Sequence, residues 1–129
     1  MPIAPRFHIP DVRELALQIK RAPEKIRLKQ IKTVEQLLCE IENETLYPFD
    51  YLVFRITKYK GDALVQSMLL GSALKGDLVS LIAEVSWTLE LPDEGMLTID
   101  ESASFLQVSS RTVSRLRGEG LVFYWVKEK

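Results

Sequence analysis

Residues 98–121 contain two helix-start signals close together, and they constrain the fold more than any other part of the chain. Thr98 and Glu101 have the spacing of a capping box, in which each side chain accepts a hydrogen bond from the other residue's backbone N–H. After a turn at 107–108, Ser109 is a good N-cap for a second helix. The stretch therefore predicts a helix–turn–helix.

A few apolar side chains would join the two predicted helices. Those expected to face inward are Ala103, Leu106, Val113 and Leu116. Val108 and Val113 have the spacing of a hydrophobic staple, which fixes the angle at which the chain enters a helix. Gly118 and Gly120 supply C-cap positions, so we expect the second helix to span about 110–118.

The open face of this second helix is small, polar and basic. The candidate DNA-binding residues are Ser109, Ser110, Arg111, Thr112, Ser114, Arg115 and Arg117. Small side chains let a helix approach the major groove, and arginine can bind phosphate or the O6 and N7 atoms of guanine. No carboxylate lies between Leu106 and Gly118. The pattern favours a recognition helix; the alternative is a helical hairpin with solvated arginines.

Composition sets the outer limits. A chain of 129 residues, 47% of them hydrophobic, can build one medium domain or two small ones. The net charge of −1 requires any nucleic-acid affinity to come from a local patch. The single cysteine, Cys39, excludes an internal disulfide and fits a reducing cytoplasm, and its apolar neighbours predict a core position. We expect a cytoplasmic protein without a signal peptide or membrane span.

Apolar residues at helical spacing predict a helical domain over 1–92. Its first helix starts at Pro10, with Asp11 and Glu14 as a capping box, and a second helix covers about 23–43, with Pro23 as its first residue. It should bury Ile31, Val34, Leu38 and Ile41, with Leu37 beside them.

A third helix should follow Pro48 and close at Gly61 and Asp62, although alternation over 52–56 also fits a strand. Another helical run covers 64–70. The next helix is capped by Ser72, and its apolar positions are Leu74, Leu78, Leu81, Ile82, Val85 and Leu89.

A linker over 91–96 leads to the helix–turn–helix domain, 93–129, which ends in an aromatic strand over 122–126. The predicted fold is all-α: an N-terminal helical domain followed by a C-terminal helix–turn–helix with a short, incomplete β wing. The unpaired strand would favour a homodimer. The alternative is that its aromatic residues pack onto the helices as core.

Charge is divided along the N-terminal helices. Residues 20–32 contain six basic side chains and one acid, and residues 35–50 contain five acids and no base. The basic cluster could attract DNA or an acidic protein, but a solvated helix surface is the interpretation we prefer. His8 is the only histidine, it lies in a proline-flanked tail where we expect it to be exposed, and no Gly-rich phosphate loop is present. We therefore expect no enzyme, metal or cofactor.

The stretch MLTIDESASFLQVSSRTVSRLRGEGLV resembles the helix–turn–helix of the MerR and excisionase-like families. The matching positions are Leu97, Thr98, Glu101, Ala103, Leu106, Val108, Ser109, Thr112, Val113, Arg115, Leu116, Gly120 and Leu121. Upstream, ETLYPFDYLVFRITKYKGD and LLGSALKGDLVSLIAE are similar to the N-terminal extension of planctomycete RNA polymerase sigma factors. In these families a two-stranded wing usually follows the recognition helix, whereas here only FYWV does. Because the sequence includes no sigma core region, we expect either the N-terminal piece of a longer sigma-like protein or a free-standing protein with a trimmed wing.

The resemblance implies a module of bacterial transcription that binds double-stranded DNA. Its alternative is a protein-interaction module that docks RNA polymerase or a regulator without contacting DNA directly.

Overall fold

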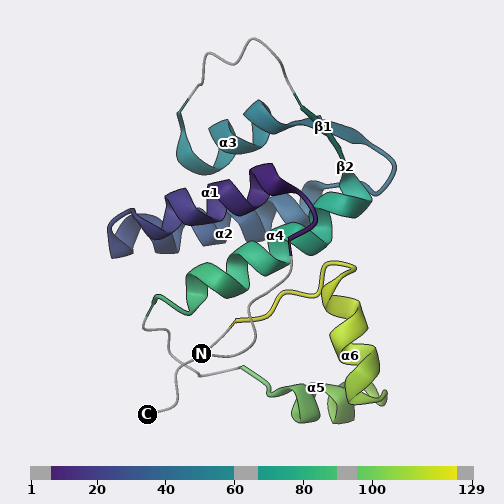
Figure 1. Ribbon diagram of the computed structural model, residues 1–129. Helices are drawn as coiled ribbons and strands as arrows, with labels where there is room; N and C mark the ends of the chain where they lie inside the picture. Colours follow the sequence, from purple (N-terminus) through teal and green to yellow (C-terminus); the bar gives the residue numbers. More distant parts are fainter. Residues whose placement is uncertain (1–6, 60–66, 90–95, 125–129) are drawn as a thin grey trace.

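The computed structural model describes residues 7–59, 67–89 and 96–124, which form six helices and one two-stranded sheet (Figure 1). In chain order the elements are α1 (Pro10–Lys20), α2 (Glu24–Glu40), β1 (Leu46–Pro48), α3 (Phe49–Thr57), β2 (Met68–Leu70), α4 (Gly71–Ser86), α5 (Ile99–Leu106) and α6 (Ser110–Arg117). The prediction of a mostly helical chain is confirmed, whereas the small sheet was not predicted. None of the helices in the described part is long and apolar enough to cross a membrane.

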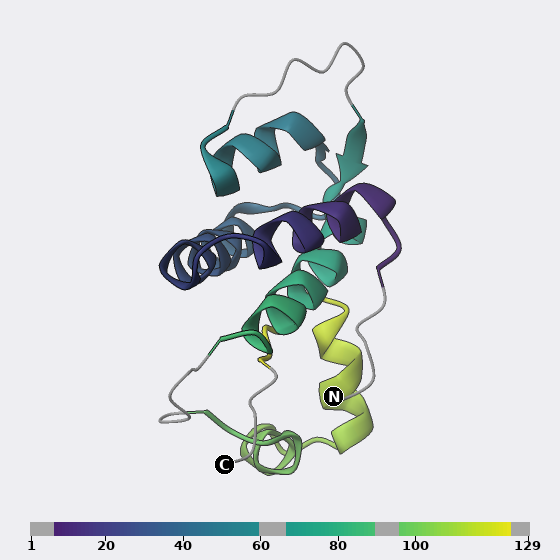
Figure 2. The ribbon, with the colours of Figure 1, turned by 60° about the vertical axis from the view of Figure 1, so that its left-hand side comes forward.

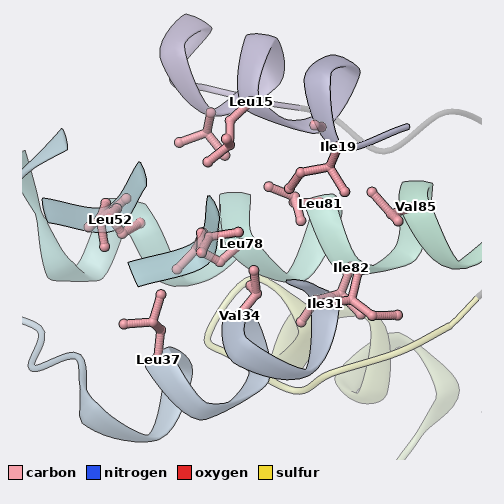
Figure 3. Packing of buried hydrophobic residues seen from close by; sticks show 14 of the residues in the cluster. Leu15, Ile19, Ile31, Val34, Leu37, Leu52, Leu78, Leu81, Ile82 and Val85 are labelled. Carbon is pink, nitrogen blue, oxygen red and sulfur yellow. The ribbon is translucent and has the colours of Figure 1, made fainter. Parts of the chain in front are cut away.

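Helix α4 is the centre of the N-terminal body. Helices α1 and α2 pack on opposite sides of it, and α3 packs against α2 (Figure 3). All the apolar positions predicted for this helix are buried: Leu74, Leu78, Leu81, Ile82, Val85 and Leu89. Burial of each such side chain contributes about 1.5–3 kcal/mol. A helix enclosed on several sides has to be apolar around most of its circumference, as α4 is.

The start of α1 differs from its prediction. Its N-cap is Ile9, no side chain of α1 caps it, and the predicted capping box of Asp11 and Glu14 is therefore wrong. Pro10 occupies the first helical position, where its missing N–H costs nothing. The backbone N–H groups just before α1 instead donate to Asp77, a buried residue of α4.

Helix α2 begins one residue later than predicted, with Pro23 as N-cap, and ends at Glu40 instead of near Asn43. Its buried residues are Ile31, Val34 and Leu37, followed by Ile41 at the C-cap; Leu38 is only half-buried. The predicted core position of Cys39 is wrong, because the cysteine is exposed. It lies two residues after Leu37, and residues two apart do not share a helix face.

The antiparallel strands β1 and β2 pair Leu46 with Leu70, Tyr47 with Leu69 and Pro48 with Met68. The helix predicted over 64–70 is thus wrong for 67–70, and residues 64–66 lie outside the described residues. The predicted Ser72 cap is also wrong, since α4 already starts at Gly71.

Backbone hydrogen bonds at the start of α4 explain why residues 68–70 form a strand and why α4 begins at Gly71. The backbone N–H of Gly71 donates to the carbonyl oxygen of Thr45 at 2.9 Å, and that of Ser72 donates to Asn43 at 3.0 Å. These contacts come from a segment distant in sequence. Helix α3 is confirmed, but its C-cap is Lys58 in a left-handed conformation; Gly61 and Asp62 lie outside the described residues.

Candidate nucleic-acid interface

The first helix of the predicted helix–turn–helix starts as expected. The backbone N–H of Glu101 donates to Thr98 Oγ1 at 3.1 Å, and that of Thr98 donates to Glu101 Oε1 at 2.9 Å. The capping box is therefore confirmed. The hydrogen bonds from the Thr98 backbone and then its side chain lower the pKa of Glu101 below its usual value.

The turn between α5 and α6 is tight. Gln107 adopts a left-handed conformation with φ 58°, and the backbone N–H of Val108 donates to the carbonyl oxygen of Ala103 at 2.9 Å. Ser109 then caps α6, because its Oγ accepts the backbone N–H of Thr112 at 3.2 Å. The predicted turn and cap are confirmed, and α6 ends at Arg117 with Gly118 as its C-cap.

The outward face of α6 carries most of the predicted site. Ser109, Ser110, Arg111, Ser114 and Arg115 are all exposed, whereas Val113 is buried and Thr112 half-buried. The hydroxyl groups of Ser109 and Thr112 lie 3.0 Å apart at the start of the helix. The structure thus places small polar side chains and two arginines together on an open helical surface.

Arg117 has a different environment. Its Cζ lies 3.9 Å from the centre of the Phe123 ring, a cation–π geometry. The side chain is half-buried, and this desolvation lowers the pKa of Arg117 from the usual arginine value. Sequence spacing grouped Arg117 with Arg111 and Arg115, but the fold turns its guanidinium toward the segment that follows α6.

That segment is not a strand. Residues 121–124 have no regular secondary structure, so the strand prediction is wrong for 122–124; Trp125 and Val126 lie outside the described residues. Val122 and Tyr124 instead pack against the core of the N-terminal body. The alternative interpretation, in which aromatic residues after α6 join the core, is confirmed for Tyr124. A homodimer through the predicted strand stays a prediction.

Sequence reasoning missed one carboxylate in the site. Ser110 Oγ donates to Asp100 Oδ1 at 3.1 Å, so α5 places an acid beside the first turn of α6. Residues 107–117 contain no acid, so nothing in the sequence indicated a carboxylate here. Asp100 belongs to α5 and reaches the first turn of α6 only in the folded structure. Asp100 opposes phosphate binding at this end of α6.

The helix pair also leaves apolar side chains exposed. Leu106, predicted to face inward, is 45% exposed, and Phe105 is 77% exposed. Leu97, Ile99 and Val108 are exposed as well. Of the four residues predicted to join the helices, only Ala103 and Val113 are buried, and Leu116 is half-buried. These exposed apolar side chains belong to α5 and to the residues on either side of it.

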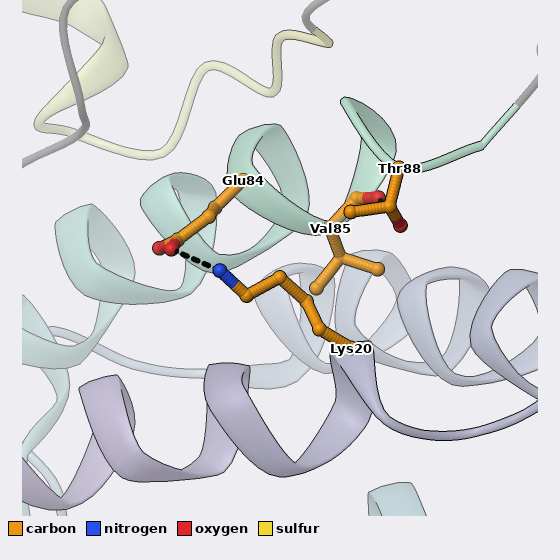
Figure 4. Close-up of polar contacts among 4 residues, drawn as sticks. All are labelled: Lys20, Glu84, Val85 and Thr88. Atoms are coloured by element: carbon orange, nitrogen blue, oxygen red, sulfur yellow. Dashed lines mark hydrogen bonds and ion pairs between the residues drawn. The ribbon is translucent and has the colours of Figure 1, made fainter.

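Two side chains of the basic cluster over 20–32 form contacts within the helical body, and others are exposed. Lys20 Nζ forms an ion pair with Glu84 Oε1 at 2.7 Å, which joins α1 to α4 (Figure 4). Arg27 donates a hydrogen bond to the carbonyl oxygen of Lys20 at 3.3 Å. Lys25, Lys29 and Lys32 are exposed on α2. This division fits the interpretation of the cluster as mainly a helix surface.

Other chemistry is not brought together. No group of histidine, cysteine and acidic residues suited to a metal ion exists in residues 7–59, 67–89 and 96–124. His8 is exposed, as expected. Burial raises the pKa of Glu35, and the positive charge of Lys32 partly offsets this rise.

No family model, curated protein or solved structure matches this chain. The resemblance to MerR-like helix–turn–helix proteins and to sigma-factor extensions therefore stays a hypothesis, and a function has to be argued from the geometry of the site.

Proposed function

We propose that the chain is a DNA-binding module of transcription, with α6 as the recognition helix in the major groove. One observation carries the proposal: the outward face of α6 exposes Ser110, Arg111, Ser114 and Arg115 on a helix whose start is fixed by the Ser109 cap. Serine side chains permit close approach, and the two arginines can bind guanine edges or phosphates.

The dimensions of α6 suit this role. An α-helix with its side chains is about 10–12 Å across, which fits the major groove of B-DNA, about 12 Å wide, and the eight residues of α6 extend about 12 Å along the helix axis. Ser109 and Thr112 lie at the helix start, where hydroxyl and backbone N–H groups favour a phosphate, but the carboxylate of Asp100 beside this turn opposes one, so the phosphate contacts of α6 fall mainly to its arginines. Arg117 stabilises the end of α6 by its contact with the Phe123 ring. Arg111 and Arg115 make the contacts with DNA.

A second function is favoured by the exposed apolar residues of α5. Phe105 and its exposed neighbours Leu97, Ile99, Leu106 and Val108 would fit a module that docks RNA polymerase or a regulator. In that case the arginines of α6 would be solvated or bind an acidic protein, and the chain would not bind DNA directly.

Fluorescence anisotropy with random-sequence duplex DNA, over a series of salt concentrations, separates the two functions. We expect salt-sensitive binding, because contacts with phosphates release counterions. The double variant Arg111→Ala/Arg115→Ala should abolish it while leaving the melting temperature unchanged. Lys25→Ala/Lys29→Ala removes the same charge from exposed positions on α2 and should leave most of the affinity. Absence of binding by the unmodified chain at low salt would refute the proposal and favour protein docking.

A further inference from the structure

The C-terminal end of α6 lies against α4 (Figures 1 and 2), and the absence of a side chain at Gly76 allows this approach. A Cβ atom added to Gly76 would lie 3.1 Å from the carbonyl oxygen of Gly118 and 3.6 Å from its Cα atom. The two backbones are therefore in contact at this point. Val122 and Tyr124 pack against the core shortly afterwards, so the end of α6 is attached to the helical body by both contacts.

Lys75 lies at this junction. A Cβ atom added to Gly120 would be 3.8 Å from Lys75 Cδ, so the aliphatic part of the lysine runs beside the chain that leaves α6. Gly120 has φ 117°, a conformation that a side chain would strain, and after this turn Val122 and Tyr124 pack against the core of the helical body. Lys75 is half-buried, and its Cδ atom packs beside the turn that follows α6.

Among the residues that the structure describes, the ion pairs are Lys20 with Glu84 and Arg55 with Glu40. Lys75 therefore forms no ion pair with an acidic side chain in this part of the chain. A cation near the C-terminal end of a helix stabilises the helix dipole, and this effect alone would give Lys75 a structural role. The position of α6 gives Lys75 a second role, in DNA binding. In helix–turn–helix folds the C-terminal end of the recognition helix can contact the sugar–phosphate backbone, and Lys75 lies beside the chain that leaves this end of α6.

We infer that Lys75 binds a DNA phosphate at the edge of the groove that α6 occupies. This inference rests on the proposed function. It makes α4 part of the DNA-binding surface, so the N-terminal body contributes directly to affinity. Because a phosphate contact positions the protein without reading bases, Lys75 adds affinity that is uniform across DNA sequences.

The test is the affinity of the full chain for short random-sequence duplexes over a salt series, measured for Lys75→Met and Lys75→Arg. Methionine keeps the stem that packs beside Gly120 and removes only the charge. We expect Lys75→Met to weaken binding a few-fold on every duplex and to reduce the slope of log K against log salt by about 0.9. Lys75→Arg should restore both. Lys25→Met is the matched control on α2 and should leave the slope unchanged.

The outcomes are distinguishable. If the unmodified chain binds and Arg111→Ala/Arg115→Ala does not, but Lys75→Met retains the full affinity and slope, the inference is overturned and the proposed function stands. A weaker affinity with an unchanged slope also overturns it, because a purely structural role would give that result. If the unmodified chain binds no duplex, the proposed function and this inference fail together.

Discussion

Asp77 caps the start of α1 from a position 68 residues further along the chain than Ile9. Its Oδ2 accepts the backbone N–H of Ile9 at 2.7 Å, and its two carboxylate oxygens accept the backbone N–H of His8 at 3.1 Å. Asp77 is fully buried on α4. A buried carboxylate is stabilised only when it has donors such as these, so the contact joins α1 to α4 and satisfies both groups.

Asp77→Ala should therefore destabilise the protein by about 2–3 kcal/mol, because hydrogen bonds to a charged group are lost and two N–H groups lose their acceptor. Asp77→Asn keeps one carbonyl acceptor and should cost less. Chemical denaturation monitored by circular dichroism measures both variants. Equal stability of Asp77→Ala and the unmodified chain would contradict the capping role.

Gly71 should tolerate no side chain. A Cβ atom there would lie 1.8 Å from the carbonyl oxygen of Glu42, so the backbone between α2 and β1 would have to move. We expect Gly71→Ala to cost about 3 kcal/mol or more in the free energy of unfolding. Gly118→Ala is the matched control: its Cβ would be 3.4 Å from Arg115 O at a helical φ of −67°, and the change should be within about 1 kcal/mol of neutral.

The capping box of α5 should respond to pH. The pKa of Glu101 is lowered in the folded state, so its contribution to stability is present above the unfolded-state pKa, near 4.5, and is lost as pH falls through the folded-state pKa. The chemical shift of the Thr98 amide proton, which donates to Glu101 Oε1, reports this titration by NMR. In Glu101→Gln the amide shift should lose its dependence on pH in the acidic range; a persistent transition would assign it to another group.

Arg117 and Phe123 should be energetically coupled. A guanidinium 3.9 Å from a ring centre and partly desolvated is expected to contribute about 0.5–2 kcal/mol. The coupling is measured by a double-mutant cycle with Arg117→Met and Phe123→Leu, which keep most of the volume of each side chain. Additive changes in the free energy of unfolding would show that the two side chains do not stabilise the end of α6 together.

Local signals predicted the helix–turn–helix well. Thr98, Glu101 and Ser109 act on backbone groups three residues away, so the residues that form each cap are close in sequence. The exposed face of α6 follows from the helical period once its start is known. The half-buried position of Arg117 could not be predicted in this way, because its partner Phe123 comes close only after the chain turns at Gly120.

The sequence by itself determined where the buried helix α4 lies, because its apolar residues recur at helical spacing whatever packs against them. It also determined both caps of the helix–turn–helix. Only the tertiary structure decided that β1 pairs with β2, that Asp77 caps α1 and that Phe123 lies against Arg117. Each of these depends on which segments meet in space, and hydrophobic burial, which drives their meeting, is non-directional and does not specify partners in a local pattern.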